Sequence, residues 1–196
     1  MDYLHGAYSQ IQTAGTRVAS KSRSAIVYIG TAPVQTLSGG GKNVNRPILV
    51  NNIAEARKLF GYSEDWAKYT LCEAMHAHFE NNAVGPLVFI NVLDPAVHKA
   101  EEEGSVSLTP ENGQITITNA EDIILDSIQI TGKNLGEDYT VQYNLGKQVI
   151  TISELRAGAL GTEALSITYS SVDPSKVDAS AVIGSSDGAG LNTGLY

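Results

Sequence analysis

The chain has 196 residues, enough to bury a hydrophobic core and to form one domain or two small ones. Its formal net charge of −8 is unevenly distributed. Residues 1–98 contain eight basic and seven acidic side chains, whereas residues 99–196 contain five basic and fourteen acidic ones. Because nucleic-acid binding depends on basic side chains that neutralise phosphates, we expect no direct contact with nucleic acid.

The cysteine content and the apolar runs exclude two further classes of protein. Cys72 is the single cysteine and cannot form a disulfide within the chain, which argues against a disulfide-stapled secreted domain. Residues 1–20 lack the basic and apolar parts of a secretion signal, and the longest apolar runs are too short to cross a bilayer. We therefore expect synthesis in the cytoplasm and no insertion into a membrane.

The first half of the chain alternates between strand and helix patterns. Residues 1–23 contain few large apolar side chains and are expected to form an extended arm. Residues 24–30 are apolar, β-branched and end in glycine, which is typical of a buried strand. The glycine-rich stretch that follows, residues 31–45, is predicted to be a flexible loop.

Two helices are predicted between a second and a third strand. The second strand covers residues 47–50, and Asn52 then caps a short helix, with Glu55 completing a capping box and the helix ending near residues 60–61. Ser63 is predicted to cap a longer helix, since Leu71, Met75 and Phe79 recur every four residues. A third strand follows at residues 87–93, so strand, helices and strand are expected to form a crossover on a parallel sheet.

After residue 98 the pattern changes to short alternating runs separated by glycines, which predicts an all-β module. The expected strands cover residues 106–108, 114–118, 123–131, 139–143, 148–152 and 165–169. The predicted fold is therefore mixed α+β. It combines an N-terminal arm (1–23), a partial α/β core domain with a parallel-type sheet and helices (24–98 plus 172–196), and an inserted all-β, sandwich-like domain (99–171).

No residue pattern indicates catalysis or cofactor binding. The run that ends in Lys42 resembles a phosphate-binding loop, but Thr36 and Asn43 stand where that loop requires a glycine and a hydroxyl. Cys72 and His76 have the spacing of a zinc-ligand pair, but two ligands do not make a site, and His78 lies on another face of an ideal helix. We predict no catalytic, cofactor-binding or metal-binding residues, and no enzyme activity.

Several stretches, taken in chain order, resemble the sheath proteins of contractile bacteriophage tails. The opening His5-Gly6-Ala7-Tyr8 is similar to the glycine–tyrosine arm of that family, and residues 29–33 are similar to its first core strand and turn. The remaining matches follow the same family order, at residues 47–50, 54–56, 59–61, 69–71, 74–75, 79–82, 87–92, 182–184 and 193–195. Asn91 stands where many members have arginine, and the later part of the family's sequence is not represented, so the chain is expected to be an N-terminal portion.

The resemblance implies a structural subunit that polymerises helically around a tail tube and contracts to drive the tube through the host envelope. The implied partners are other copies of the chain, the tail tube protein, and baseplate and tail-terminator proteins. The implied location is the virion tail, after assembly in the host cytoplasm. The arm would then join subunits by adding a strand to a neighbour's sheet, through residues Tyr8, Ile11, Thr13, Arg17 and Val18.

Two other functions are compatible with parts of the sequence. Residues 100–171 could form a virion-surface or glycan-binding module, which exposed tyrosines at 139, 143 and 169 would support. Core or cross-strand packing is the simpler explanation of these tyrosines. A hydrolase is the third possibility, but acidic pairs such as Asp122 with Asp126 lie in a stretch where surface charge is expected.

Overall fold

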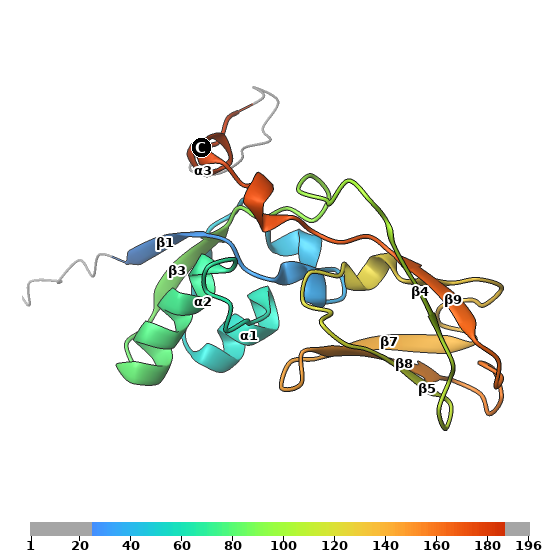
Figure 1. Ribbon diagram of the computed structural model, residues 1–196. Helices are drawn as coiled ribbons and strands as arrows, with labels where there is room; N and C mark the ends of the chain where they lie inside the picture. Colours follow the sequence, from blue (N-terminus) through green and yellow to red (C-terminus); the bar gives the residue numbers. More distant parts are fainter. Residues whose placement is uncertain (1–24, 187–196) are drawn as a thin grey trace, which may run out of the picture.

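The computed structural model describes residues 25–186, so the predicted arm and its five proposed contact residues lie outside the described residues. Two groups of elements lie side by side (Figure 1). We call residues 25–98 and 172–186 the helical half, and residues 99–171 the β half. No helix in the described range is long and apolar enough to span a membrane. The predicted mixed α and β class is confirmed.

The helical half contains a three-stranded sheet in the order β1-β3-β2. Its strands are β1 (Ile26–Gly30), β2 (Ile48–Val50) and β3 (Leu87–Asn91). The predicted parallel pairing is correct for β1 with β3 but wrong for β2 with β3, which pair antiparallel. Two helical segments rather than one separate β2 from β3, so the chain re-enters the sheet from the end at which it left. A single crossover helix would have returned it to the opposite end.

Helix α1 (Ile53–Phe60) begins and ends where the sequence predicts. The amide of Glu55 donates to Asn52 Oδ1 at 2.9 Å, which is the predicted cap. The Glu55 carboxylate reaches back to the amide of Asn51 at 2.9 Å instead of to Asn52 itself. Gly61 ends the helix at φ +76°, where a β-carbon would lie 2.6 Å from the carbonyl oxygen of Pro33. Only glycine fits this close approach.

The second helix is shorter than predicted at its start. It consists of α2 (Thr70–Met75), continued by the π-helical segment η3 (His76–Asn81). Ser63 does not cap it, because residues 63–69 form turns in which Ser63 Oγ accepts from the amide of Asp65 at 2.9 Å. The helix begins where it meets the segment after β1: the amide of Leu71 donates to the carbonyl oxygen of Thr31 at 2.9 Å. Tertiary contact, and not the local capping pattern, therefore sets this boundary.

The predicted flexible loop after β1 is wrong for its first part. Residues 31–36 are buried, and the loop contains two short 3₁₀ segments, η1 (Val34–Thr36) and η2 (Gly40–Asn43). The buried backbone is satisfied by a side chain. Asn91, which is fully buried, accepts from the amides of Ala32 at 2.9 Å and Leu93 at 3.1 Å and donates to the Leu93 carbonyl at 3.0 Å. The glycines indicated a loop, but the apolar residues before them are packed.

The β half contains two antiparallel sheets of three strands, in the orders β4-β9-β6 and β5-β8-β7. The strands are β4 (Gly104–Leu108), β5 (Gln114–Ile117), β6 (Gln129–Ile130), β7 (Tyr139–Asn144), β8 (Val149–Glu154) and β9 (Leu165–Tyr169). The prediction of one strand over 123–131 is wrong, because η4 (Leu125–Ser127) interrupts it. The alternating apolar residues of this stretch lie in and around the η4 turn, and their side chains are buried in the core of the β half. The chain then returns through η5 (Pro174–Lys176) to α3 (Ala179–Ile183).

Replacing Asn91 with alanine tests whether its side chain holds the buried segment in place. The variant leaves buried backbone amides without acceptors, and each such group costs about 1–3 kcal/mol. We expect the Asn91→Ala variant to lose at least about 2 kcal/mol in the free energy of unfolding by urea titration. The exposed Asn82, which bonds only the Ala77 carbonyl, provides the control, and Asn82→Ala should cost under about 0.5 kcal/mol. Equal losses in the two variants would contradict the role of Asn91.

Candidate functional site

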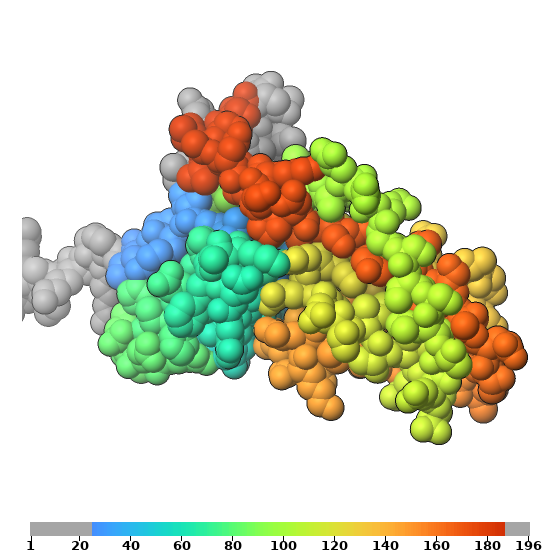
Figure 2. Space-filling model, in the orientation of Figure 1, coloured from blue at the N-terminus to red at the C-terminus, as the bar shows by residue number. Residues whose placement is uncertain are grey.

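The two halves have separate apolar cores. The first core lies between the sheet and the helices and includes Phe60, Tyr69, Leu71 and Phe89. The second draws on residues from both sheets of the β half, and its buried members all fall within residues 115–167. Ile124 and Leu145 of the β half pack against the edge of the first core, so some apolar contact connects the halves. Where the halves meet, the surface is continuous across the junction (Figure 2).

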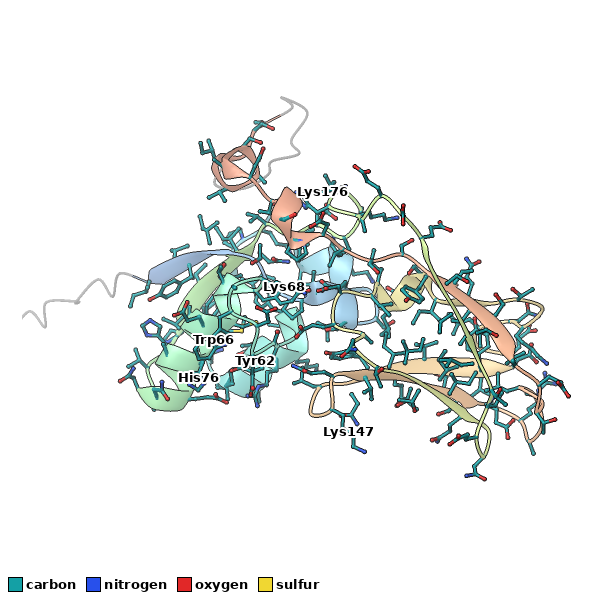
Figure 3. All side chains as sticks on the ribbon, viewed as in Figure 1. Tyr62, Trp66, Lys68, His76, Lys147 and Lys176 are labelled. Atoms are coloured by element: carbon teal, nitrogen blue, oxygen red, sulfur yellow. The ribbon has the colours of Figure 1, made fainter. Side chains whose placement is uncertain are left out.

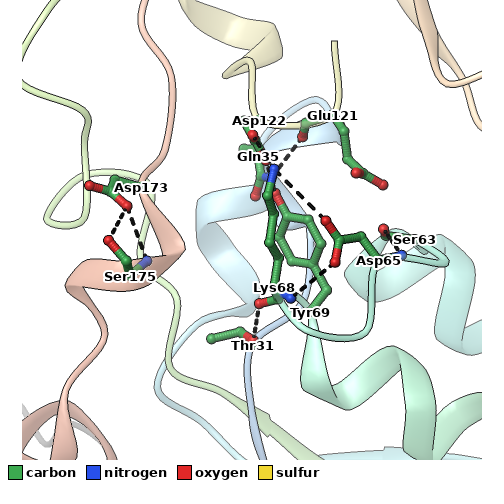
Figure 4. Close-up of polar contacts among 10 residues, drawn as sticks. All are labelled: Thr31, Gln35, Ser63, Asp65, Lys68, Tyr69, Glu121, Asp122, Asp173 and Ser175. Atoms are coloured by element: carbon green, nitrogen blue, oxygen red, sulfur yellow. Dashed lines mark hydrogen bonds and ion pairs between the residues drawn. The ribbon is translucent and has the colours of Figure 1, made fainter. Parts of the chain in front are cut away.

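The junction is otherwise built from polar side chains that converge on Asp122 (Figure 4). Its Oδ1 accepts from the Tyr69 hydroxyl at 2.6 Å, and its Oδ2 accepts from Lys68 Nζ at 2.8 Å. Gln35, which is 2% exposed, donates from Nε2 to the Tyr69 hydroxyl at 2.7 Å and to the carbonyl oxygen of Glu121 at 2.9 Å. We call these five residues the Asp122 network. Three of them lie in the helical half and two in the β half.

A two-stranded neck joins the halves beside this network. The amide of Ala100 donates to the Ser171 carbonyl at 2.8 Å, and the amide of Asp173 donates to the His98 carbonyl at 2.8 Å. The outgoing and returning chains therefore pair with each other where they cross. The neck also carries Asp122, because the amide of Val172 donates to the Asp122 carbonyl at 2.8 Å.

Burial at the junction raises the pKa values of Tyr69, Glu121 and Tyr143. Burial is the largest effect and raises the pKa of Glu121. A hydrogen bond with the Ser63 side chain opposes it, and the nearby Asp122 carboxylate adds a smaller increase. The pKa of Tyr69 is also raised, first by burial and then by its hydrogen bond to Asp122. Burial raises the pKa of Tyr143 to about 12. Both tyrosines are therefore neutral at physiological pH, and Tyr69 donates its hydroxyl hydrogen to Asp122.

Three buried polar atoms at the junction have no hydrogen-bond partner: Gln35 Oε1, Glu121 Oε1 and the Tyr143 hydroxyl. Buried polar groups are nearly always paired, so these three make the junction less stable than its hydrogen bonds alone suggest. No local sequence pattern predicted this network, because its five members come from three stretches that are far apart in the chain. The sequence suggested an acidic pair of Asp122 with Asp126, but Asp126 Oδ2 instead accepts from the amide of Gly39 at 2.7 Å.

The sheet of the helical half ends in two strands, β1 and β2, that have no neighbour on their outer sides among the described residues. One face of the sheet is covered by helices, since Phe89 contacts both Phe60 and Phe79 through their rings. The opposite face carries Val27 and Leu49, which are 51% and 52% exposed and flank Val88 in register. The helical half therefore offers open backbone edges next to exposed apolar side chains, a combination that favours association.

The residues weighed as zinc ligands have other contacts. Cys72 is fully buried, and burial raises its thiol pKa to about 12. His76 Nδ1 lies 2.6 Å from Glu80 Oε2, and its ring lies 5.1 Å from that of Trp66, a group visible in Figure 3. His78 bonds the hydroxyl of Tyr28. No cluster of three or more potential metal ligands occurs among residues 25–186.

Comparison with known proteins confirms the resemblance seen in the sequence: the chain is similar to a phage tail sheath protein. The relative is the tail sheath protein of Burkholderia phage BcepMu, 30% identical over 202 aligned positions. The alignment covers 99% of this chain but 39% of that protein, so the chain spans well under half the length of its relative. No protein-family model and no solved structure matches the chain.

Replacing Glu121 with glutamine tests the electrostatics of the junction. The pKa of Glu121 is raised in the folded state. This carboxyl group therefore adds most to the free energy of unfolding at a pH below its unfolded pKa, and that stabilisation is lost as the pH rises through its folded pKa. Ionisation of this partly buried carboxylate therefore costs stability. We expect Glu121→Gln to raise the melting temperature at pH 7, and the difference to shrink towards zero as the pH falls to about 4. The exposed Glu102→Gln should show neither effect. A Glu121→Gln variant that melts lower at pH 7 would contradict the assignment.

Proposed function

We propose that the chain is part of a structural subunit of a contractile tail sheath, which assembles helically around a tail tube and shortens to drive the tube through a host envelope. The observation that carries the proposal is the similarity to a tail sheath protein across 99% of this chain. We propose further that the subunit has no enzyme activity, and that its location is the virion tail after assembly in the host cytoplasm. Its partners would be other copies of itself, a tail tube protein, and baseplate and terminator proteins.

The open sheet edges support assembly by strand addition. A helical sheath needs contacts between unlike surfaces, so each copy must offer one surface that inserts and one that receives. The outer edge of β1 is a receiving surface of this kind, with unpaired backbone groups beside the exposed Val27. We propose that residues 1–23 of a neighbouring copy insert there or at β2, through Tyr8, Ile11, Thr13, Arg17 and Val18.

A glycan-binding function of the β half has no comparable support. Tyr139 is buried and its hydroxyl accepts from the amide of Ile130 at 3.3 Å, so this ring belongs to the core. Tyr143 and Tyr169 are half-buried and pack against the same core. An aromatic platform for sugars needs rings with an exposed face, which these tyrosines use for packing.

Deletion of residues 1–20 from the longer sheath protein tests the arm. The deletion removes few large apolar side chains, so we expect an unchanged melting temperature. Assembly should fail, because the edge strand that joins subunits is lost, and electron microscopy should show no tubes. A control with residues 1–20 in scrambled order keeps length and charge. Normal tubes from the deletion variant would show that the arm does not connect subunits.

We also propose that residues 99–171 form an inserted domain with a sandwich-like arrangement of its two sheets. Its apolar core draws all its buried members from within this segment, so few apolar contacts would be lost on separation. Expressed alone, the segment should unfold in one cooperative transition, with loss of its β-sheet circular dichroism signal. A gradual signal change without a transition would show that the β half depends on the helical half.

A further inference from the structure

The Asp122 network joins the helical half to the β half, and each half has its own apolar core. We propose that the junction is a hinge, and that Asp122 holds the β half in its closed orientation against the helical half. In this proposal, loss of the hydrogen bonds to Asp122 lets the β half rotate about the two-stranded neck while both cores stay folded. The hinge does not depend on sheath assembly.

The side-chain contacts of Asp122 are concentrated in one short segment of the helical half. The hydrogen bonds to the Asp122 carboxylate come from Tyr69 and Lys68, two consecutive residues just before and at the cap of α2. One short segment of the helical half therefore supplies both. A contact of this kind is made or broken as a unit, unlike an interlocked apolar interface, which opens only when many side chains separate.

The closed state carries a desolvation cost that opening would remove. Gln35 Oε1, Glu121 Oε1 and the Tyr143 hydroxyl are buried without partners, and all three belong to residues at this junction. Water would satisfy each of them in an open state. The closed state gains the bonds to Asp122 and loses the hydration of these three atoms. Such opposing contributions bring two orientations close in free energy.

The neck can bend without disrupting either core. The two chains that cross it, near residues 98–100 and 171–173, are held by backbone hydrogen bonds and by Lys176 Nζ, which donates to the Lys99 carbonyl at 2.9 Å. Neither chain belongs to a named strand of the three sheets. Short connecting segments of this kind absorb the dihedral changes of domain movement.

The ion pair between Lys68 Nζ and Asp122 Oδ2, at 2.8 Å, adds a charge contribution to the closed state. Lys68 is the basic group that faces the Asp122 carboxylate, and the acidic groups of its surroundings are Asp65 and Glu121. Lys68 also lies 3.9 Å from Asp65, so its charge serves both sides of the junction. Asparagine at position 122 would keep the size of the side chain but remove the charge that Lys68 pairs with.

Distance measurements between spin labels on the two halves test the hinge in the whole chain. Labels at Lys58→Cys on α1 and Gln142→Cys on β7 occupy exposed positions, and the native Cys72 is buried with a raised thiol pKa, so it should not react. We expect one narrow distance distribution for the labelled parent. Asp122→Asn should add a population at longer distance, and Tyr69→Phe should shift it in the same direction. The control Asp138→Asn, which removes a carboxylate paired with Arg156 inside the β half, should leave the distribution unchanged.

Amide hydrogen exchange on the same variants separates hinge opening from unfolding. The protection of β3 and β8 should be the same in Asp122→Asn as in the parent, because both cores stay intact. Two results would overturn the proposal. One is an unchanged distance distribution in Asp122→Asn. The other is loss of protection in either strand, which would show that Asp122 holds the fold together and not its orientation.

Discussion

The structure depends on one constraint: the segment after β1 is buried without a strand to pair with. Its backbone groups must therefore be satisfied by side chains and by the ends of other elements. Asn91 supplies an acceptor for the amide of Ala32, and Thr31 exchanges hydrogen bonds with the first turn of α2. Gly30 makes this approach possible, since a β-carbon there would lie 2.3 Å from Thr70 Oγ1. The segment thus fixes where the second helix begins.

The same segment determines the character of the junction. Gln35 lies at its end and carries the contact onward to Tyr69 and to the backbone of the β half. Because the groups that meet there are polar, the halves are joined by directional bonds rather than by a shared apolar core. This explains how one chain combines a helix-covered sheet that offers open edges with a β half that can differ in orientation.

The sequence predicted elements whose signals are local. The Asn52 cap, the alternation in β7 and β8 and the run of β3 depend on neighbouring residues alone, and all were predicted correctly. The misses concern residues whose state depends on distant partners. The turns before Thr70, the burial of residues 31–36 and the break before β6 follow from tertiary contacts. The Asp122 network was not predicted for the same reason, since Gln35 and Glu121 are far apart in the sequence.

A sheath subunit that assembles by strand addition must offer a sheet edge that a neighbour can complete. Electron cryo-microscopy of tubes assembled from the longer protein tests this most directly. The account predicts density for a neighbour's N-terminal residues paired along the free edge of β1 or β2, continuous with the sheet β1-β3-β2. Edges that face solvent in the tube, or that are paired only by the subunit's own chain, would contradict it.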